Sequence, residues 1–202
     1  MLILFNKPYG VICQFSPSGD KPTLKNYIDI PGVYPAGRLD TDSEGLLLLT
    51  DDGVLQARIA DPRYKLTKTY WAEVEGAPKD ADLMPLRQGI NLGDFVTQPA
   101  SVRTIDSPPA LWPRDPPVRI RKHIPTQWLE IGIHEGKNRQ IRRMTAHIGL
   151  PTLRLIRVAI GPWQIDNLAN GKWQQSTLNA LQLTTNTGQK SKKTVNRTVN
   201  NP

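Results

Sequence analysis

The chain has 202 residues, a formal net charge of +8 and a single cysteine, Cys13. One cysteine excludes an intrachain disulfide and a zinc site built from several cysteines. The longest apolar runs are far too short to span a membrane, and the first residues lack a signal-peptide cleavage pattern. We therefore expect a soluble, cytoplasmic protein that is long enough to bury a core.

Six segments carry the apolar or alternating pattern of β-strands. The alternation of Leu129, Ile131 and Ile133 is typical of a half-buried strand, whereas the four consecutive leucines at 46–49 indicate a strand buried on both faces. The predicted strands cover residues 2–5, 11–15, 46–49, 68–75, 127–133 and 153–160.

Helices are fewer. Residues 54–60 predict a helix whose N-cap is one of residues 50–52, and residues 79–88 predict a second helix that Pro85 weakens. Residues 106–125 contain six prolines and predict a long irregular connection. These elements indicate a strand-rich α+β fold.

Acidic residues surround the leucine run in GRLDTDSEGLLLLTDDG, residues 37–53. An EF-hand-like calcium loop is matched at positions 1, 3, 5, 6 and 12 by Asp40, Asp42, Glu44, Gly45 and Asp51. Leucines at positions 7 to 10 of such a loop fit a buried strand better. Asp40 then lies on the loop that enters the strand, where a carboxylate is held rigidly within reach of a substrate. A merely solvated turn is the plain alternative.

Residues 138–148 predict a third helix, which Gly149 and Pro151 stop. One face carries Ile141, Met144 and Ile148, and another carries Arg139, Arg142 and Arg143. With Lys137, Arg154 and Arg157, the segment 137–157 holds six basic residues and no acid. Such an imbalance favours contact with nucleic-acid phosphates over a plain solvated face.

Together these features resemble a known family. GRLD, followed after two residues by Ser, one residue, Gly, four aliphatic residues and Thr-Asp, is similar to the signature of the RsuA-type bacterial ribosomal RNA pseudouridine synthases. The family's other blocks follow in order, and the resemblance covers about residues 2–173. These blocks are FNKPYGV (5–11), KTY (68–70), EGKNRQIRRM (135–144) and GLPTLRLIRVAIG (149–161).

The resemblance implies the pseudouridine synthase catalytic fold, an α+β fold with a mostly antiparallel mixed central sheet flanked by helices and loops. We expect one catalytic domain over residues 1–183, without an extra N-terminal RNA-binding module. The implied reaction isomerises a specific uridine of 23S ribosomal RNA, free or in a large-subunit precursor, by detaching the base, rotating it and reattaching it through carbon 5. The resemblance implies no cofactor and no metal, and we expect a monomer.

The resemblance also implies site residues. Asp40, the aspartate of GRLD, is the implied catalytic residue, Tyr70 packs against the base and is a candidate for taking the carbon-5 proton, and Arg142 pairs with Asp40. An arginine would keep the carboxylate ionised in a dry pocket. The candidate RNA-binding residues are Lys7, Arg38, Lys137, Arg139, Arg143, Arg154 and Arg157.

Several alternatives stay open. Asp40 can attack the base, attack the sugar or abstract a sugar proton. A noncatalytic RNA-binding ribosome-assembly protein would use the same basic surface, with Asp40 only bracing a turn, and a base-removing glycosidase could also use a carboxylate. Residues 184–202 carry four of the eight net positive charges and predict a disordered basic tail, either inert or weakly attracted to RNA.

Overall fold

A computed structural model describes residues 1–109, 111–119 and 121–176 of the chain. The predicted end of the catalytic domain at residue 183 and the tail 184–202 lie outside these residues. Within them, no helix is long and apolar enough to cross a membrane. The strands are β1 (Leu2–Lys7), β2 (Tyr34–Pro35), β3 (Glu44–Thr50), β4 (Lys68–Glu75), β5 (Ser101–Ile105), β6 (Thr126–Ile133), β7 (Thr152–Ile160), β8 (Trp163–Gln164) and β9 (Trp173–Gln175). The helices are α1 (Gly53–Ala60), α2 (Met84–Gln88) and α3 (Gln140–His147), with 3₁₀ turns at Leu24–Asn26, Pro62–Tyr64 and Asp80–Leu83.

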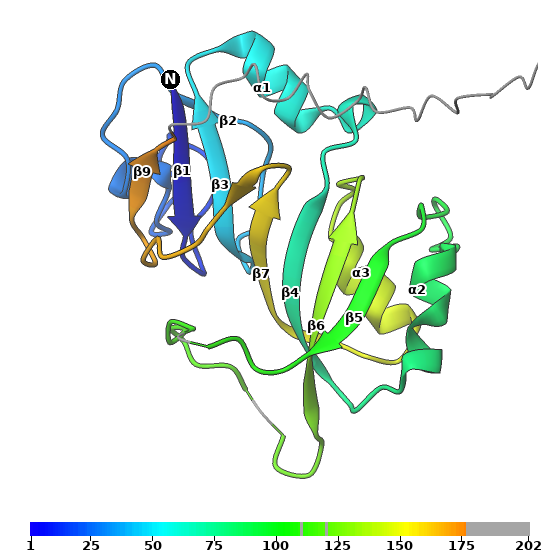
Figure 1. The fold of residues 1–202 in the computed structure, drawn as a ribbon. Coiled ribbons are helices and arrows are strands. Elements are labelled where there is room, and N and C mark those ends of the chain that lie inside the picture. Colours follow the sequence, from blue (N-terminus) through cyan, green and yellow to red (C-terminus); the bar gives the residue numbers. More distant parts are fainter. Residues whose placement is uncertain (110, 120, 177–202) are drawn as a thin grey trace, which may run out of the picture.

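The described strands form one sheet in the order β5-β6-β4-β7-β3-β1-β9, with β2 attached to β3 and β8 attached to β7. The β3–β7 pair is parallel, and the other described pairs are antiparallel. Figure 1 shows the sheet turning from β9 and β1 at one end to β5 at the other, as strand twist requires. The predicted α+β fold with a mostly antiparallel mixed sheet is confirmed.

The leucine run is the middle of β3 and is fully buried. Leu46 and Leu48 pack into one apolar cluster with the helix α1, whereas Leu47 and Leu49 pack into another beneath the loop that follows β1. Because both faces of β3 are covered, every position in the run is apolar. This geometry also places Asp40 and Asp51 at opposite ends of a strand, which is incompatible with a calcium loop.

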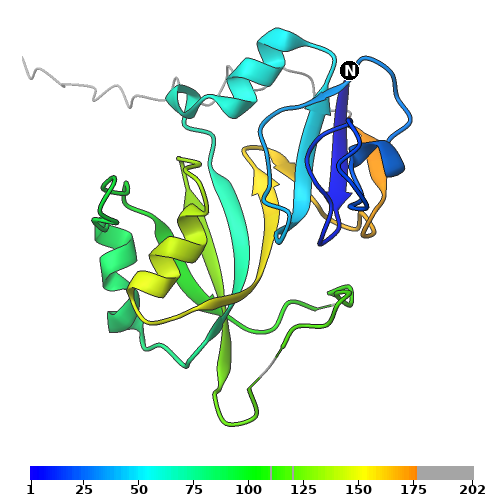
Figure 2. The same cartoon turned by 180° about the vertical axis from the view of Figure 1, so that it is seen from behind.

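The other half of the sheet is covered by α2 and α3, which lie against the strands β4 to β6 in Figure 2. Ile141 and Met144 of α3 are buried there, and Ile148 is partly buried, as the helix pattern predicts. Leu83 and Leu86 from the α2 region join the same core. The beginning of α3 is therefore held rigidly beside the sheet.

Two predicted elements differ from the structure. Residues 11–15 are not a strand: Ile12 makes a single bridge to Thr23, and fully buried Val11 packs under the sheet as part of a loop. The helix predicted over 79–88 is a 3₁₀ turn followed by the short helix α2, with Pro85 in its first turn. A proline is tolerated there because the first-turn N–H groups have no partner in the helix.

The sequence leaves the cap of α1 open among three residues and does not predict the strands β2, β5, β8 and β9. Asp52 accepts hydrogen bonds from the N–H groups of Val54 and Leu55, at 2.8 and 3.0 Å, so it is the N-cap among the three candidates. The strand β5 was not predicted, because only Val102 among its residues is buried. In Figure 1 the connection between β5 and β6 crosses the ends of the strands, and Trp112 within it donates to the carboxylate of Glu44 on β3 at 2.7 Å.

Candidate active site

A cleft of about 760 Å³ opens where three segments meet. The loop before β3 contributes residues 36–43, the loop before α3 contributes residues 136–141, and the strands β4 and β7 form the floor. Asp40 and Tyr70 both line this cleft. The structure therefore brings together two residues that are 30 positions apart in the sequence, as the resemblance implies.

The backbone around Asp40 is held on both sides, while its carboxylate stays reachable. The N–H group of Ser43 donates to the carbonyl oxygen of Asp40 at 3.0 Å. Leu39 is buried, and its carbonyl oxygen accepts from the Cys13 thiol at 3.2 Å. The Asp40 side chain nevertheless remains 37% exposed. A carboxylate on a fixed loop with an open face is suited to direct chemistry on a ligand.

The arginine that lies near the Asp40 carboxylate is Arg139, with Nη1 at 3.9 Å from Oδ2. Arg142 instead donates from Nη2 to the carbonyl oxygen of Asp42 at 2.7 Å and from Nη1 to that of Thr152 at 3.0 Å, and its Nε lies 3.4 Å from the Asp42 carboxylate. The prediction that Arg142 pairs with Asp40 is therefore wrong, because Asp42 and the two carbonyl groups occupy its guanidinium.

Asp42 is the most strongly paired acid of this loop. Arg139 forms two hydrogen bonds with its carboxylate, at 3.0 and 2.9 Å. Burial would raise the pKa of Asp42, but the hydrogen bonds from Arg139 and the charge of Arg142 outweigh it and lower the pKa below its ordinary value. Asp42 therefore ties the loop before β3 to the helix α3.

Tyr70 lies on β4 with its side chain 7% exposed, and it belongs to the same core as Leu39. It is paired in register with Ile131 on β6 and with Arg157 on β7, next to an irregularity in the β4–β7 ladder. A largely buried aromatic ring that borders a cleft can stack against a planar ring entering from outside.

Three of the predicted RNA-binding residues are buried, and two of these, Lys7 and Arg154, do not line the cleft. Lys7 is fully buried and donates to the carbonyl oxygens of Pro8 and Val11, at 2.9 and 2.8 Å, and burial lowers its pKa to about 8. Arg154 forms a buried ion pair with Glu44 at 2.8 Å. Both placements correct the prediction of a side chain facing phosphate, since each cation is used to organise neighbouring segments.

The remaining predicted RNA-binding residues lie at the floor of the cleft, at its rim or on the helix α3. Arg157 is buried at the cleft floor and donates to the carbonyl oxygens of Leu46 and Arg38, at 2.8 and 3.4 Å. Arg38 and Lys137 line the cleft and are exposed.

Arg139 is exposed and Arg143 is half-buried, and each has an acidic partner from a distant segment. Arg139 pairs with Asp42, and Arg143 pairs with Asp94 and stacks on Phe95 with 5.1 Å between the guanidinium carbon and the ring centroid. The expected unbalanced charge of the segment 137–157 is thus partly neutralised in the folded protein.

Lys68 is a cleft residue that the sequence reasoning did not single out. It is 9% exposed, and burial together with the nearby charge of Arg157 lowers its pKa. The available signal was the alternation of the strand 68–75, which places Lys68 on the same face as Tyr70.

Comparison with known proteins agrees with this geometry. A model of the family described as RNA pseudouridylate synthase matches residues 1–147. A solved structure described as the crystal structure of pseudouridylate synthase is 27% identical, with a TM-score of 0.72, and the match covers 90% of this chain and 71% of that one. The archaeal box H/ACA sRNP Nop10-Cbf5 complex shares the fold at 17% identity and a TM-score of 0.53, over 82% of this chain and 49% of the other. The chain belongs to the RNA pseudouridylate synthase family and is an RNA-modifying isomerase.

Within the family, the blocks ALWPRDPP, PTLRLIR and NLANGKW predict a likeness to the ribosomal large-subunit pseudouridine synthase E. This likeness is confirmed. "Ribosomal large subunit pseudouridine synthase E" of Xanthomonas axonopodis pv. citri (strain 306) is 61% identical over 84% of this chain and 90% of its own length. The protein of the same name from Vibrio parahaemolyticus serotype O3:K6 (strain RIMD 2210633) is 52% identical over 88% of this chain and 74% of its own length.

Proposed function

We propose that this pseudouridine synthase isomerises one uridine of 23S ribosomal RNA and that Asp40 is its catalytic carboxylate. The observation that carries the proposal is the exposed Asp40 carboxylate on a fixed loop, in one cleft with the Tyr70 ring. The names of the relatives that are more than half identical to this chain support a large-subunit RNA substrate.

The chemistry of the site suits this reaction. Breaking the bond between C1′ and N1 develops positive charge on the ribose and negative charge on the uracil. The Asp40 carboxylate can bond to an electron-poor carbon or take a proton, and the positive charge of Arg139 lies 3.9 Å from it. The cleft of about 760 Å³ is large enough for a nucleoside.

A uridine stacked in RNA must leave its stack before Asp40 can reach it, and Tyr70 would replace the lost stacking against the flipped base. Arg38, Lys137 and Arg139 lie at the cleft and would contact the flanking phosphates. Binding would therefore weaken with salt. The proposal includes action as a cytoplasmic monomer without a cofactor, and light scattering of the purified protein tests the oligomeric state.

The test is incubation of unmodified 23S RNA with the wild-type protein, Asp40→Asn or the control Asp29→Asn, an exposed acid outside the cleft. Pseudouridine is mapped by carbodiimide adducts and primer extension. We expect one new stop with the wild type and the control and none with Asp40→Asn, which should still fold and bind RNA. Normal turnover by Asp40→Asn would refute its assigned role.

Two other outcomes separate the alternatives. Tight binding of 23S RNA without a stop calls for the same assay on large-subunit precursor particles, and a stop there would identify the particle as the substrate. Binding without modification of either RNA would favour a noncatalytic assembly protein. Release of free uracil would indicate a glycosidase.

A further inference from the structure

Two cations at the cleft floor lack an acidic partner among residues 1–109, 111–119 and 121–176. Lys68 on β4 and Arg157 on β7 are 9% and 3% exposed, and both line the cleft that holds Asp40 and Tyr70. Within the described part of the chain, Lys68 has no hydrogen-bond or ion-pair partner, and Nη2 of Arg157 is buried without one. The floor of the cleft therefore carries two positive charges, and the described residues offer no hydrogen-bond acceptor to Lys68 or to Nη2 of Arg157.

The contrast with Arg154 shows that this fold can neutralise a buried cation. Arg154 is on the same strand as Arg157, and Glu44 binds it through two hydrogen bonds of 2.8 Å. At the cleft floor the like charge of Arg157 instead adds to burial in lowering the pKa of Lys68. A buried pair of like charges is unfavourable unless an anion joins it.

The position of the two cations indicates which anion they would bind. Lys68 and Tyr70 are two residues apart on β4 and share a face, and Arg157 is opposite Tyr70 in the ladder. An anion between them therefore lies at the ring of Tyr70, where the proposed function puts the uracil. The RNA phosphates would instead meet exposed cations at the rim, such as Arg38 and Lys137.

We propose that Lys68 and Arg157 form an anion hole that stabilises the detached uracil, so that Lys68 is a further catalytic residue. The inference rests on the proposed function. When the bond between C1′ and N1 breaks, its electron pair stays on the uracil and spreads over N1, O2 and O4. Hydrogen-bond donors aimed at this charge lower the barrier. C5 of the anion then bonds to C1′, either as the Asp40 carboxylate leaves that carbon or as the abstracted proton returns to the ribose. C5 loses its proton to a base, and N1 regains a proton.

This assignment holds for both ways in which Asp40 can act on the sugar. Attack on C1′ and abstraction of a ribose proton both release the uracil with the electron pair of the broken bond. Arg157 has a second task, because its Nη1 also holds the carbonyl oxygen of Arg38 on the Asp40 loop. Lys68 is therefore the better residue to test, since its side chain has no structural partner among the described residues.

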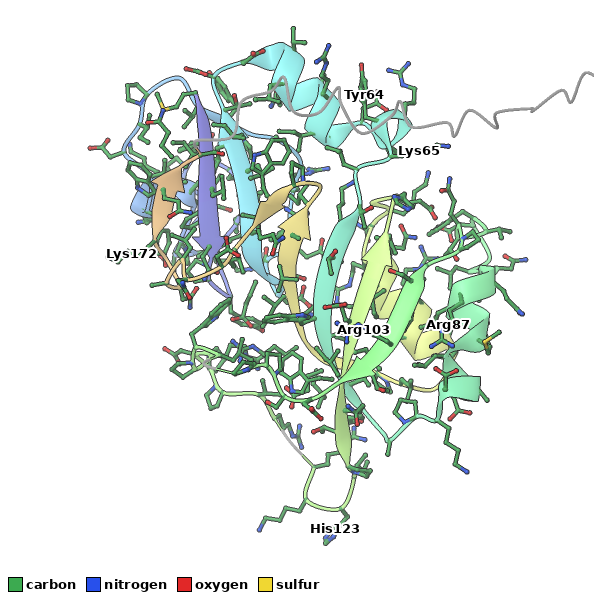
Figure 3. The ribbon with its side chains drawn as sticks, viewed as in Figure 1. Tyr64, Lys65, Arg87, Arg103, His123 and Lys172 are labelled. Carbon is green, nitrogen blue, oxygen red and sulfur yellow. The ribbon has the colours of Figure 1, made fainter. Side chains whose placement is uncertain are left out.

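The test measures single-turnover rates at saturating enzyme for Lys68→Met, which removes the charge, and Lys68→Arg, which keeps it. The matched control is Lys172→Met, an exposed lysine outside the cleft, beside β9 in Figure 3. Each protein acts on 23S transcripts made with uridine or with 5-fluorouridine throughout. Conversion is followed by mass spectrometry of the digested RNA as pseudouridine or the rearranged 5-fluorouracil C-glycoside.

We expect Lys68→Met to lower the rate with uridine by about 100-fold to 1,000-fold without changing the dissociation constant for RNA. With 5-fluorouridine the loss should shrink by about tenfold or more, because fluorine stabilises the leaving uracil without help from the protein. Lys68→Arg should recover part of the rate, and Lys172→Met should behave like the wild type.

Three results would overturn the anion hole. They are an unchanged rate for Lys68→Met, an equal loss with both nucleosides, and a loss in Lys68→Arg as large as in Lys68→Met. Each result leaves the proposed function intact if the wild type makes pseudouridine. Failure of the wild type on RNA and on precursor particles would instead remove the proposed function itself.

Discussion

Arg142 donates a 2.7 Å hydrogen bond to the backbone carbonyl oxygen of Asp42, two residues beyond Asp40. Its second guanidinium nitrogen binds the carbonyl oxygen of Thr152 at the start of β7. Arg142 thus connects the helix α3, the sheet and the loop that carries Asp40. Its contribution is to place Asp40, whereas Arg139 supplies the nearer charge.

This geometry predicts different effects for the two arginines. Arg142→Lys cannot hold both carbonyl groups with a planar fork, so the Asp40 loop shifts and the single-turnover rate falls by about 100-fold, with little change in RNA affinity. Arg139→Gln removes a charge 3.9 Å from Asp40 that is partly exposed, and a loss of about tenfold or less is expected. Rates and filter binding on the same RNA check both values. A larger loss of rate in Arg139→Gln than in Arg142→Lys would show that the charge beside Asp40 matters more than the position of its loop.

The buried ion pair of Glu44 and Arg154 predicts a large stability effect. Arg154→Met removes the cation that binds the buried Glu44 side chain, which should lower the free energy of unfolding by about 3 to 5 kcal/mol. The double variant Glu44→Met/Arg154→Met should recover part of this loss, because no unpaired charge remains inside. Urea denaturation measures each value.

The exposed pair of Arg103 and Glu130 is the matched control for that substitution. Its nitrogen and oxygen are 2.7 Å apart, but the Arg103 side chain, on β5 in Figure 3, is 65% exposed. Arg103→Met should therefore cost less than about 1 kcal/mol. Equal costs for Arg154→Met and Arg103→Met would contradict the interpretation of a buried pair.

Gly45 lets β3 approach β7 closely. Its φ is +100°, and an added Cβ would lie 2.3 Å from the carbonyl oxygen of Arg157 and 2.8 Å from its nitrogen. Gly45→Ala should therefore destabilise the protein by about 3 kcal/mol or more, through backbone strain and forced separation of the strands.

A substitution at Gly93 distinguishes the effect of backbone strain from that of strand separation. Its φ of +96° is similar, but an added Cβ would meet no atom within 4 Å. Gly93→Ala should cost only the strain, about 1 to 2 kcal/mol. Thermal and urea unfolding of both variants measures the difference, and a Gly45→Ala variant as stable as Gly93→Ala would show that the strands separate without cost.

Buried Lys7 predicts a pH dependence of stability. Burial lowers its pKa from 10.5 to about 8, with a smaller opposing effect of nearby acids. Between these values the unfolded chain binds more protons, so the free energy of unfolding rises with pH. The cost of the charged lysine is fully present below pH 8 and disappears as the pH approaches 10.5.

Comparison with Lys7→Met isolates this effect from other titrating groups. The stability of the wild type relative to Lys7→Met should increase by up to about 3 kcal/mol as the pH rises through this window. Urea denaturation at several pH values gives the two curves. Parallel curves would mean that Lys7 keeps its charge equally well in the folded and unfolded protein.

Much of the fold could be predicted locally. The strand β4 has the predicted bounds, and β3, β6 and β7 differ by one or two residues at their ends, because the alternating or continuous apolar pattern reports burial on one or both faces. The error over residues 11–15 arose because buried apolar residues in a loop resemble those of a strand.

Those residues of the site that lie in short sequence motifs of the family could be predicted. By itself the sequence determined the elements, the family likeness and the candidacy of Asp40 and Tyr70, because these depend on residue type and short spacing. Charge partners depend on distances between segments far apart in the chain. Tertiary structure alone therefore decided that Arg142 holds Asp42 and that Glu44 pairs with Arg154 in the interior. It also decided that Lys68 and Arg157 lie at the cleft floor without an acidic partner among the described residues.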